Sequence, residues 1–111
     1  MVIEDILNEA CVVTSLKATS KKQALNELAR LAAEKTGLSE RAIFDVLLER
    51  ERLGTTGVGD GIAIPHGKLP DLAKLFGCFA RLENPVEFDA VDNAPVDLVF
   101  LLLAPESAGA D

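Results

Sequence analysis

The pattern of apolar and polar positions predicts two consecutive helices in the first half of the chain. In each helix, apolar residues recur every three or four positions, which is the spacing of one helix face. Ser20 can cap the first helix, with Gln23 completing a capping box, and Gly37 ends it. A second helix begins after Ser39 and ends before Gly54. The two helices therefore form a helical hairpin with a very short turn.

Apolar runs in the second half of the chain predict strands. Residues 61–64 form a short run that ends at Pro65, and residues 75–82 form a longer run that closes in a turn at residues 83–85. Residues 96–103 include seven apolar residues in eight, which is typical of a strand covered on both faces. These runs leave open whether the strands are parallel or antiparallel.

The length and the mixture of elements predict a single α/β domain. A further short strand is expected around residues 11–13, after a helical turn near residues 3–7. Strands mixed with helices of this length favour a three-layer sandwich. A chain of 111 residues suits one domain, residues 1–111, with one hydrophobic core.

Composition excludes several classes of function. The chain has 11 basic and 18 acidic residues, a net charge of −7, and lacks the positive field that a nucleic-acid-binding protein needs. With five Phe, no Trp and no Tyr, it also lacks aromatic platforms for stacking bases or sugars. The negative charge instead favours a protein partner with a basic face.

The cysteines and the apolar runs predict a cytoplasmic protein without a metal site and without direct membrane insertion. Cys11 and Cys78 are the only cysteines, and no Cys/His cluster accompanies them. We therefore expect buried free thiols in a reducing compartment. The first residues lack the basic and then apolar plan of a signal peptide. The longest apolar run, residues 98–104, is too short to cross a bilayer.

The clearest chemical pattern is a glycine-rich segment, residues 53–67, that joins the second helix to a short strand. Its glycines allow tight turns and bring backbone N–H groups close to an anion, and its threonines add hydroxyl donors. It is not a P-loop, because it lacks Gly-Lys-Ser/Thr and follows a helix where a P-loop follows a strand. We predict a phosphate-binding loop made of Thr55, Thr56, Gly57, Gly59 and Gly61.

His66, the only histidine, is the candidate catalytic residue. Pro65 holds the preceding backbone extended, and Gly67 removes a side chain that would crowd an incoming partner. Metal binding needs more ligands, and a hydrolytic triad needs a nucleophile and an orienting acid. An imidazole that is itself the nucleophile needs few partner residues: one nitrogen attacks phosphorus while a hydrogen-bond acceptor holds the proton on the other nitrogen. A structural histidine is the alternative.

Residues 50–68 resemble the active-site signature of the fructose/mannitol-type enzyme IIA domains of the bacterial phosphotransferase system. The resemblance extends through residues 85–90 and 92–98 into the apolar run at 99–103. It covers essentially all of the given chain, but only the N-terminal part of the family domain. Such a long run of matched special residues is highly specific. Within the family, the sequence is most similar to the nitrogen-regulatory enzyme IIA.

The resemblance implies a fold, a site and partners. The implied fold is a mixed β-sheet flanked by helices on both faces. The implied phosphorylated residue is His66, and Arg50 matches an arginine that lies near the active histidine in the family. As an alternative, the positive charge of Arg50 only stabilises the C-terminal end of its helix. No cofactor is implied. An HPr-like carrier supplies the phosphate, which then acts as a signal to regulatory targets or passes to a IIB domain.

Alternatives within and outside the family stay open at this point. A sugar-specific role is disfavoured because no IIB or membrane segment is attached. A regulator that had lost phosphotransfer would have a replaced His66 or replaced loop glycines, and all are intact. Family domains normally continue into further helices, and many carry a second histidine there. We therefore expect the natural chain to continue past Asp111, so that the sequence lacks the C-terminal helical part of the domain.

Overall fold

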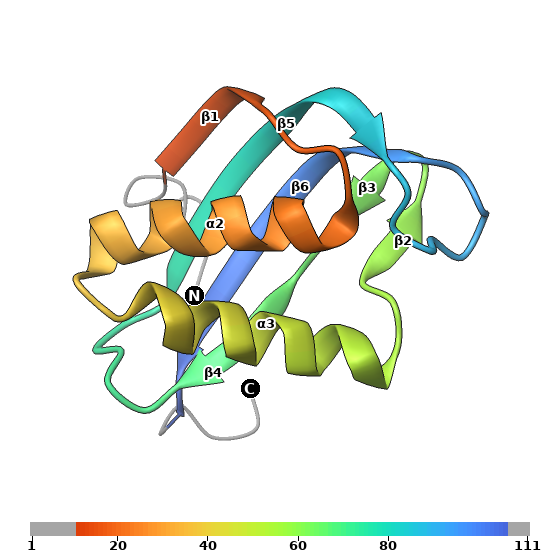
Figure 1. Ribbon diagram of the computed structural model, residues 1–111. Helices are drawn as coiled ribbons and strands as arrows, with labels where there is room; N and C mark the ends of the chain where they lie inside the picture. The colour runs from red at the N-terminus through yellow and green to blue at the C-terminus, as the bar shows by residue number, and fades with distance from the viewer. Residues whose placement is uncertain (1–10, 107–111) are drawn as a thin grey trace.

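The computed structural model describes residues 11–106, and the helical turn expected near residues 3–7 lies outside them. In this part of the chain, one strand is followed by two helices and then by five more strands (Figure 1). In chain order the elements are β1 (Cys11–Leu16), α2 (Lys21–Thr36), α3 (Glu40–Leu53), β2 (Gly57–Gly59), β3 (Ile62–Ala63), β4 (His66–Leu69), β5 (Phe76–Val86) and β6 (Val96–Pro105).

The strands form one mixed sheet with β6 at its centre. Their order is β1-β5-β6-β3-β2, and β4 also pairs with β6. β1 runs parallel to β5, which runs antiparallel to β6. β3 and β4 run parallel to β6 along its other edge, and β2 runs antiparallel to β3. The predicted α/β class and mixed sheet are confirmed.

One edge of β6 holds the segment that carries the candidate site. Ile62 of β3 pairs with Leu98, and His66 of β4 pairs with Leu102, so both short strands keep a single register along β6. Between them, the carbonyl of Pro65 accepts the N–H of Leu102 at 3.0 Å. The backbone before and after the interval between β3 and β4 is therefore hydrogen-bonded to the central strand, and this fixes the position of His66.

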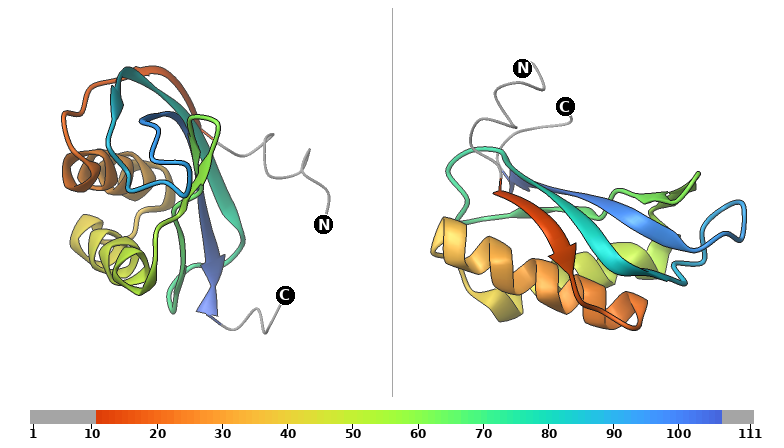
Figure 2. Two further views of the ribbon diagram at one scale, coloured as in Figure 1. Left: turned by 90° about the vertical axis from the view of Figure 1, so that its right-hand side faces the viewer. Right: turned by 90° about the horizontal axis from the view of Figure 1, so that it is seen from above.

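Both helices cover the same face of the sheet (Figure 2). The hydroxyls of Ser20 and Ser39 accept backbone N–H groups of Gln23 and Ala42, which confirms the two predicted N-caps. The side chain of Gln23 reaches back to the N–H of Thr19 instead of Ser20, so the capping box is shifted by one residue. Within residues 11–106, no helix covers the opposite face and none is long and apolar enough to span a membrane.

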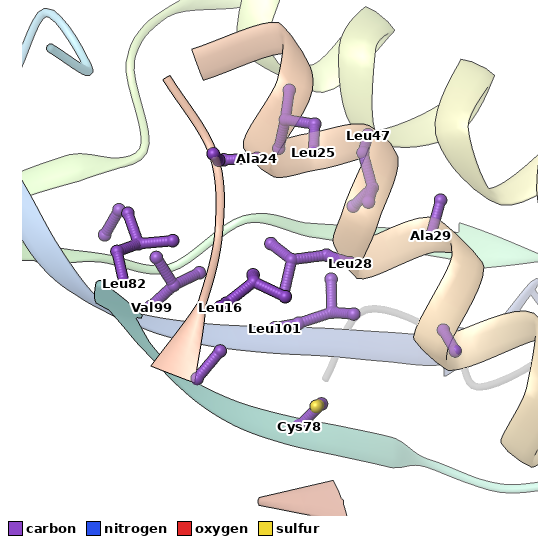
Figure 3. Packing of buried hydrophobic residues seen from close by; sticks show 14 of the residues in the cluster. Leu16, Ala24, Leu25, Leu28, Ala29, Leu47, Cys78, Leu82, Val99 and Leu101 are labelled. Atoms are coloured by element: carbon purple, nitrogen blue, oxygen red, sulfur yellow. The ribbon is translucent and has the colours of Figure 1, made fainter. Parts of the chain in front are cut away.

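The core lies between the helices and the sheet (Figure 3). Leu25 and Leu28 of α2 and Leu47 of α3 pack there with Val99 and Leu101 of β6, and each of these side chains is at most 1% exposed. Burial of one such side chain stabilises the fold by roughly 1.5–3 kcal/mol. This packing fixes α3, and with it the helix end that faces β4.

The opposite face of the sheet is apolar but less covered by the described residues. Leu98, Phe100 and Leu102 alternate with the buried residues of β6 and are half-buried. The ring of Phe100 meets that of Phe79 edge to face, with centroids 6.4 Å apart. Residues 11–106 therefore cover β6 fully on its helix side only.

β5 corrects the prediction of a turn at residues 83–85. The strand continues through Pro85 and ends at Val86. Its register with β6 shifts between Arg81 and Val86. Such an irregularity tolerates a proline, which has no N–H to give to the ladder. A turn composition thus lies inside a strand because the ladder is interrupted there.

Cys78 corrects the prediction of free thiols. Its side chain is fully buried, as expected, but it is disulfide-bonded. Its Cα partner in the parallel register of β1 and β5 is Cys11. Adjacent strands thus bring together two positions that are far apart in the sequence, which spacing alone does not reveal.

Candidate functional site

The imidazole of His66 has a defined pattern of hydrogen bonds. His66 is the first residue of β4, and its side chain is exposed. Nδ1 lies 2.9 Å from the carbonyl oxygen of Ile64. Since a carbonyl only accepts, we assign the proton to Nδ1. Nε2 then carries a lone pair and accepts Nε–H of Arg50 at 3.2 Å. The site thus holds a neutral imidazole whose Nε2 faces a cation.

Arg50 lies in the last turn of α3, where the structure brings it to His66. Besides its bond to the imidazole, its Nη1 donates to the carbonyl of Gly54 at 2.9 Å. A guanidinium has five N–H donors, so these two bonds leave donors for an anion at Nε2. The same position satisfies a carbonyl at the helix end, so Arg50 serves the helix and faces the imidazole at once.

The two threonines of the predicted phosphate-binding loop bond to other parts of the protein. The hydroxyl of Thr55 donates to the carbonyl of Phe88 at 2.7 Å, and the hydroxyl of Thr56 bonds to the carboxylate of Glu51. Thr56 is 3% exposed. A hydroxyl has one hydrogen to donate, so both bonds compete with phosphate binding. The phosphate-binding role of these side chains stays a prediction.

The glycines of the loop are needed for its backbone path. Gly59 and Gly61 have φ of +106° and +79°, a region that side chains with a Cβ rarely adopt. A Cβ on Gly57 would lie 2.9 Å from that of Ala90, and one on Gly61 would lie 2.9 Å from Oδ1 of Asp97. The glycines thus let the loop pass close to residues 90–97. Their predicted contact with phosphate stays untested.

The structure shows a reason for glycine at position 67 that the sequence did not reveal. A Cβ at this position would overlap Cγ1 of Val46 on α3. The glycine therefore lets α3 approach β4 closely, which sets the distance between Arg50 and His66. Close packing of a helix on a strand is thus one reason for the glycine, and the predicted reason, room for an incoming partner, stays a prediction.

Glu51 was missed by sequence reasoning. It follows Arg50 and is 8% exposed, although it carries a charge. A signal existed in the sequence. Leu47 is buried one helical turn before Glu51 and Ile43 two turns before it, so position 51 continues their four-residue spacing. A charged residue on a buried helix face needs a partner, which marks it for attention.

Asp92 fastens the turn that leads into β3. Its carboxylate accepts the N–H of Asp60 at 3.0 Å and that of Ala94 at 3.1 Å. These backbone donors, with that of Asp60 the stronger influence, hold the pKa of Asp92 below its usual value. The turn and the segment after β5 are thereby linked on the exposed side of the loop.

Within residues 11–106, no group of three or more His, Cys, Asp or Glu side chains is arranged to hold a metal ion.

Comparison with known proteins identifies the class to which this fold and site belong. Residues 5–110 match the family model described as phosphoenolpyruvate-dependent sugar phosphotransferase system, EIIA 2. The chain belongs to this family, which confirms the resemblance seen in the sequence.

The relatives narrow the similarity within the family. A nitrogen regulatory protein from Bradyrhizobium diazoefficiens is 63% identical over 111 residues, which is 100% of this chain and 72% of the relative. The structure of the nitrogen regulatory protein IIA-Ntr from Neisseria meningitidis is 40% identical, with a TM-score of 0.85 over 97% of this chain and 74% of that one. IIA mannitol from Escherichia coli is 27% identical, with a TM-score of 0.70 over 86% of this chain and 70% of that one.

Proposed function

We propose that the chain accepts a phosphoryl group on Nε2 of His66 from an HPr-like carrier protein. The observation that supports this most directly is the arrangement of the imidazole: Ile64 holds the proton on Nδ1, and Arg50 faces Nε2. Membership of the phosphotransferase family supports a role in phosphoryl transfer. His66 is exposed, so a second protein can reach it.

The proposed transfer exchanges one nitrogen–phosphorus bond for another. When the Nε–H of Arg50 turns from Nε2 to the incoming phosphoryl oxygens, the lone pair of Nε2 is free to attack phosphorus on the donor's phosphohistidine, and the bond to the donor nitrogen breaks with its electron pair returning to the donor. The proton on Nδ1 stays in its bond to Ile64, which stabilises the positive charge that develops on the ring. Arg50 offsets the phosphoryl charge of roughly −2.

We further propose that the phosphorylation state regulates target proteins in the cytoplasm. The relative that is 63% identical carries a nitrogen-regulatory name, whereas sugar-specific relatives are less similar: a fructose-specific EIIA component from Haloferax volcanii is 42% identical and IIA mannitol is 27% identical. The alternative, transfer to a IIB domain as in sugar-specific members, is therefore weaker. Both roles begin with the same phosphorylated histidine.

Arg50→Lys should slow phosphorylation by about tenfold or more. A guanidinium can bridge two phosphoryl oxygens, whereas an ammonium acts as a point charge, and a lost charge-assisted bond costs on the order of 1.5–3 kcal/mol. The measurement is the rate of acid-labile labelling from a phosphorylated HPr-type carrier. Arg52→Lys is the control, because Arg52 pairs with exposed Glu49. Equal, near-native rates in the two variants would assign Arg50 to the helix end.

Gly61→Ala should slow phosphorylation several-fold, whereas Gly37→Ala should not. The two glycines have nearly the same φ, +79° and +78°, so both substitutions introduce strain of about 1 kcal/mol or more. A Cβ on Gly61 also meets Asp97, whereas one on Gly37 meets nothing within 4 Å. The comparison of labelling rates and of unfolding by urea separates loop shape from backbone strain. Unchanged labelling in Gly61→Ala would show that the loop tolerates a side chain there.

A further inference from the structure

Glu51 occupies an unusual place beside the candidate catalytic residues. It is one of two buried polar or charged residues found among the described residues, and the other is Thr56. A carboxylate that is removed from water needs partners that compensate for its lost hydration. Its partners therefore indicate why the charge is buried there.

Glu51 joins three parts of the chain. Its Oε1 accepts the backbone N–H of Thr56 at 2.9 Å and also the hydroxyl of Thr56. Its Oε2 forms an ion pair with Nζ of Lys21, in the first turn of α2, at 2.7 Å. The ammonium of Lys21 also lies 5.2 Å from the ring centroid of Phe88. The carboxylate thus ties α3 to the glycine-rich loop and to α2.

The bonds continue from Thr56 to the imidazole. The carbonyl of Thr56 accepts the N–H of Ile64 at 2.9 Å, and the carbonyl of Ile64 faces Nδ1 of His66 at 2.9 Å. On the other side, Arg50 precedes Glu51 on the same helix turn and donates to Nε2 of His66. Both groups that hold the imidazole are therefore connected to Glu51, one through the loop and one through the helix.

We propose that Glu51 is a positioning residue, which holds Thr56 so that Ile64 and Arg50 keep the imidazole of His66 in its reactive orientation. This inference rests on the proposed phosphorylation of His66. Glu51 does not touch the phosphoryl group; it sets the distance between the helix end and the loop. The two bonds that Oε1 of Glu51 accepts from Thr56 carry this role, and the ion pair with Lys21 neutralises the buried charge.

Glu51→Met removes the acceptor, and we expect it to lower the maximal rate of phosphorylation by about tenfold or more. Displacement of a reacting group by ~1 Å can cost that much. The concentration of carrier at half-maximal rate should change less than about twofold, because Glu51 is buried away from a docking protein. Glu51→Gln should recover most of the rate, since its amide oxygen can accept from Thr56. Glu49→Met, at an exposed position of the same helix, is the control.

A spectroscopic measurement tests the inference without any phosphate. Long-range ¹H–¹⁵N spectra of the imidazole should show Nδ1 protonated and Nε2 unprotonated in the unsubstituted protein and in Glu51→Gln, and a mixture of tautomers in Glu51→Met. If Glu51→Met does not fold, Thr56→Val removes the hydroxyl bond to Glu51 while the backbone N–H of residue 56 still donates, so the rate and the tautomer mixture should change in the same direction but by less. A folded Glu51→Met with one tautomer and a native rate would overturn the inference. An unsubstituted protein that takes up no phosphate would instead refute the proposed function, and the spectra would still decide on Glu51.

Discussion

The His66→Ala protein takes up no acid-labile phosphate from a phosphorylated HPr-type carrier: this is the largest effect that we expect on the proposed activity. His66 is the only imidazole in the chain, so no second histidine can replace it. Its side chain is exposed, and its bonds go to one carbonyl and one flexible side chain. The free energy of unfolding should therefore change by no more than about 0.5 kcal/mol. Labelling after a fixed time and urea denaturation measure the two quantities.

Two outcomes would contradict this expectation in different ways. Labelling that survives in His66→Ala would show that another side chain accepts the phosphate. Loss of labelling together with loss of the fold would show that the imidazole is a structural group, the alternative that the sequence left open. Native stability together with loss of labelling would support His66 as the nucleophile and exclude both alternatives.

The sequence could predict those parts of the fold that depend on local chemistry. Ser20 and Ser39 cap the helices because their hydroxyls accept N–H groups three residues away, a bond that needs no distant partner. The central strand is recognisable from its apolar run. β2 and β4 could not be predicted, because they are only three and four residues long; β2 contains two glycines, and β4 contains a glycine and two polar side chains. Their strand conformation comes from pairing with β3 and β6.

In the candidate site, too, the sequence reveals what depends on residue type and not what depends on tertiary packing. His66 is chemically conspicuous as the only histidine, and the resemblance to enzyme IIA singled out Arg50 beside it. The contact between the two depends on how α3 packs against β4. Glu51 could not be assigned a role, because its partners Lys21 and Thr56 lie on another helix and in the loop. The sequence thus indicates the candidate groups of the site but not the packing that holds them in place.

Gly67→Ala should destabilise the protein by about 1–3 kcal/mol, a large effect for the addition of one methyl group. The new Cβ would overlap Cγ1 of Val46, so α3 must move away from β4 or the strand must shift. Arg50 lies one turn after Val46, and His66 precedes Gly67, so the same movement separates the guanidinium from the imidazole. Phosphorylation should therefore slow together with the loss of stability. Urea denaturation and the labelling rate measure the two effects.

A double-mutant cycle with Val46→Ala decides whether this overlap is the cause. Val46→Ala alone removes the colliding atom and leaves a small space on the half-buried side of α3, so it should cost stability. In the double variant, the methyl group added at position 67 occupies part of that space. The double variant should therefore be more stable than the sum of the two single effects predicts, with a coupling of about 1 kcal/mol or more. It should also label faster than Gly67→Ala, because α3 can again approach β4 and return Arg50 to His66. Additive losses would show that Gly67 is required for its backbone alone, and that Val46 does not set the spacing of the site.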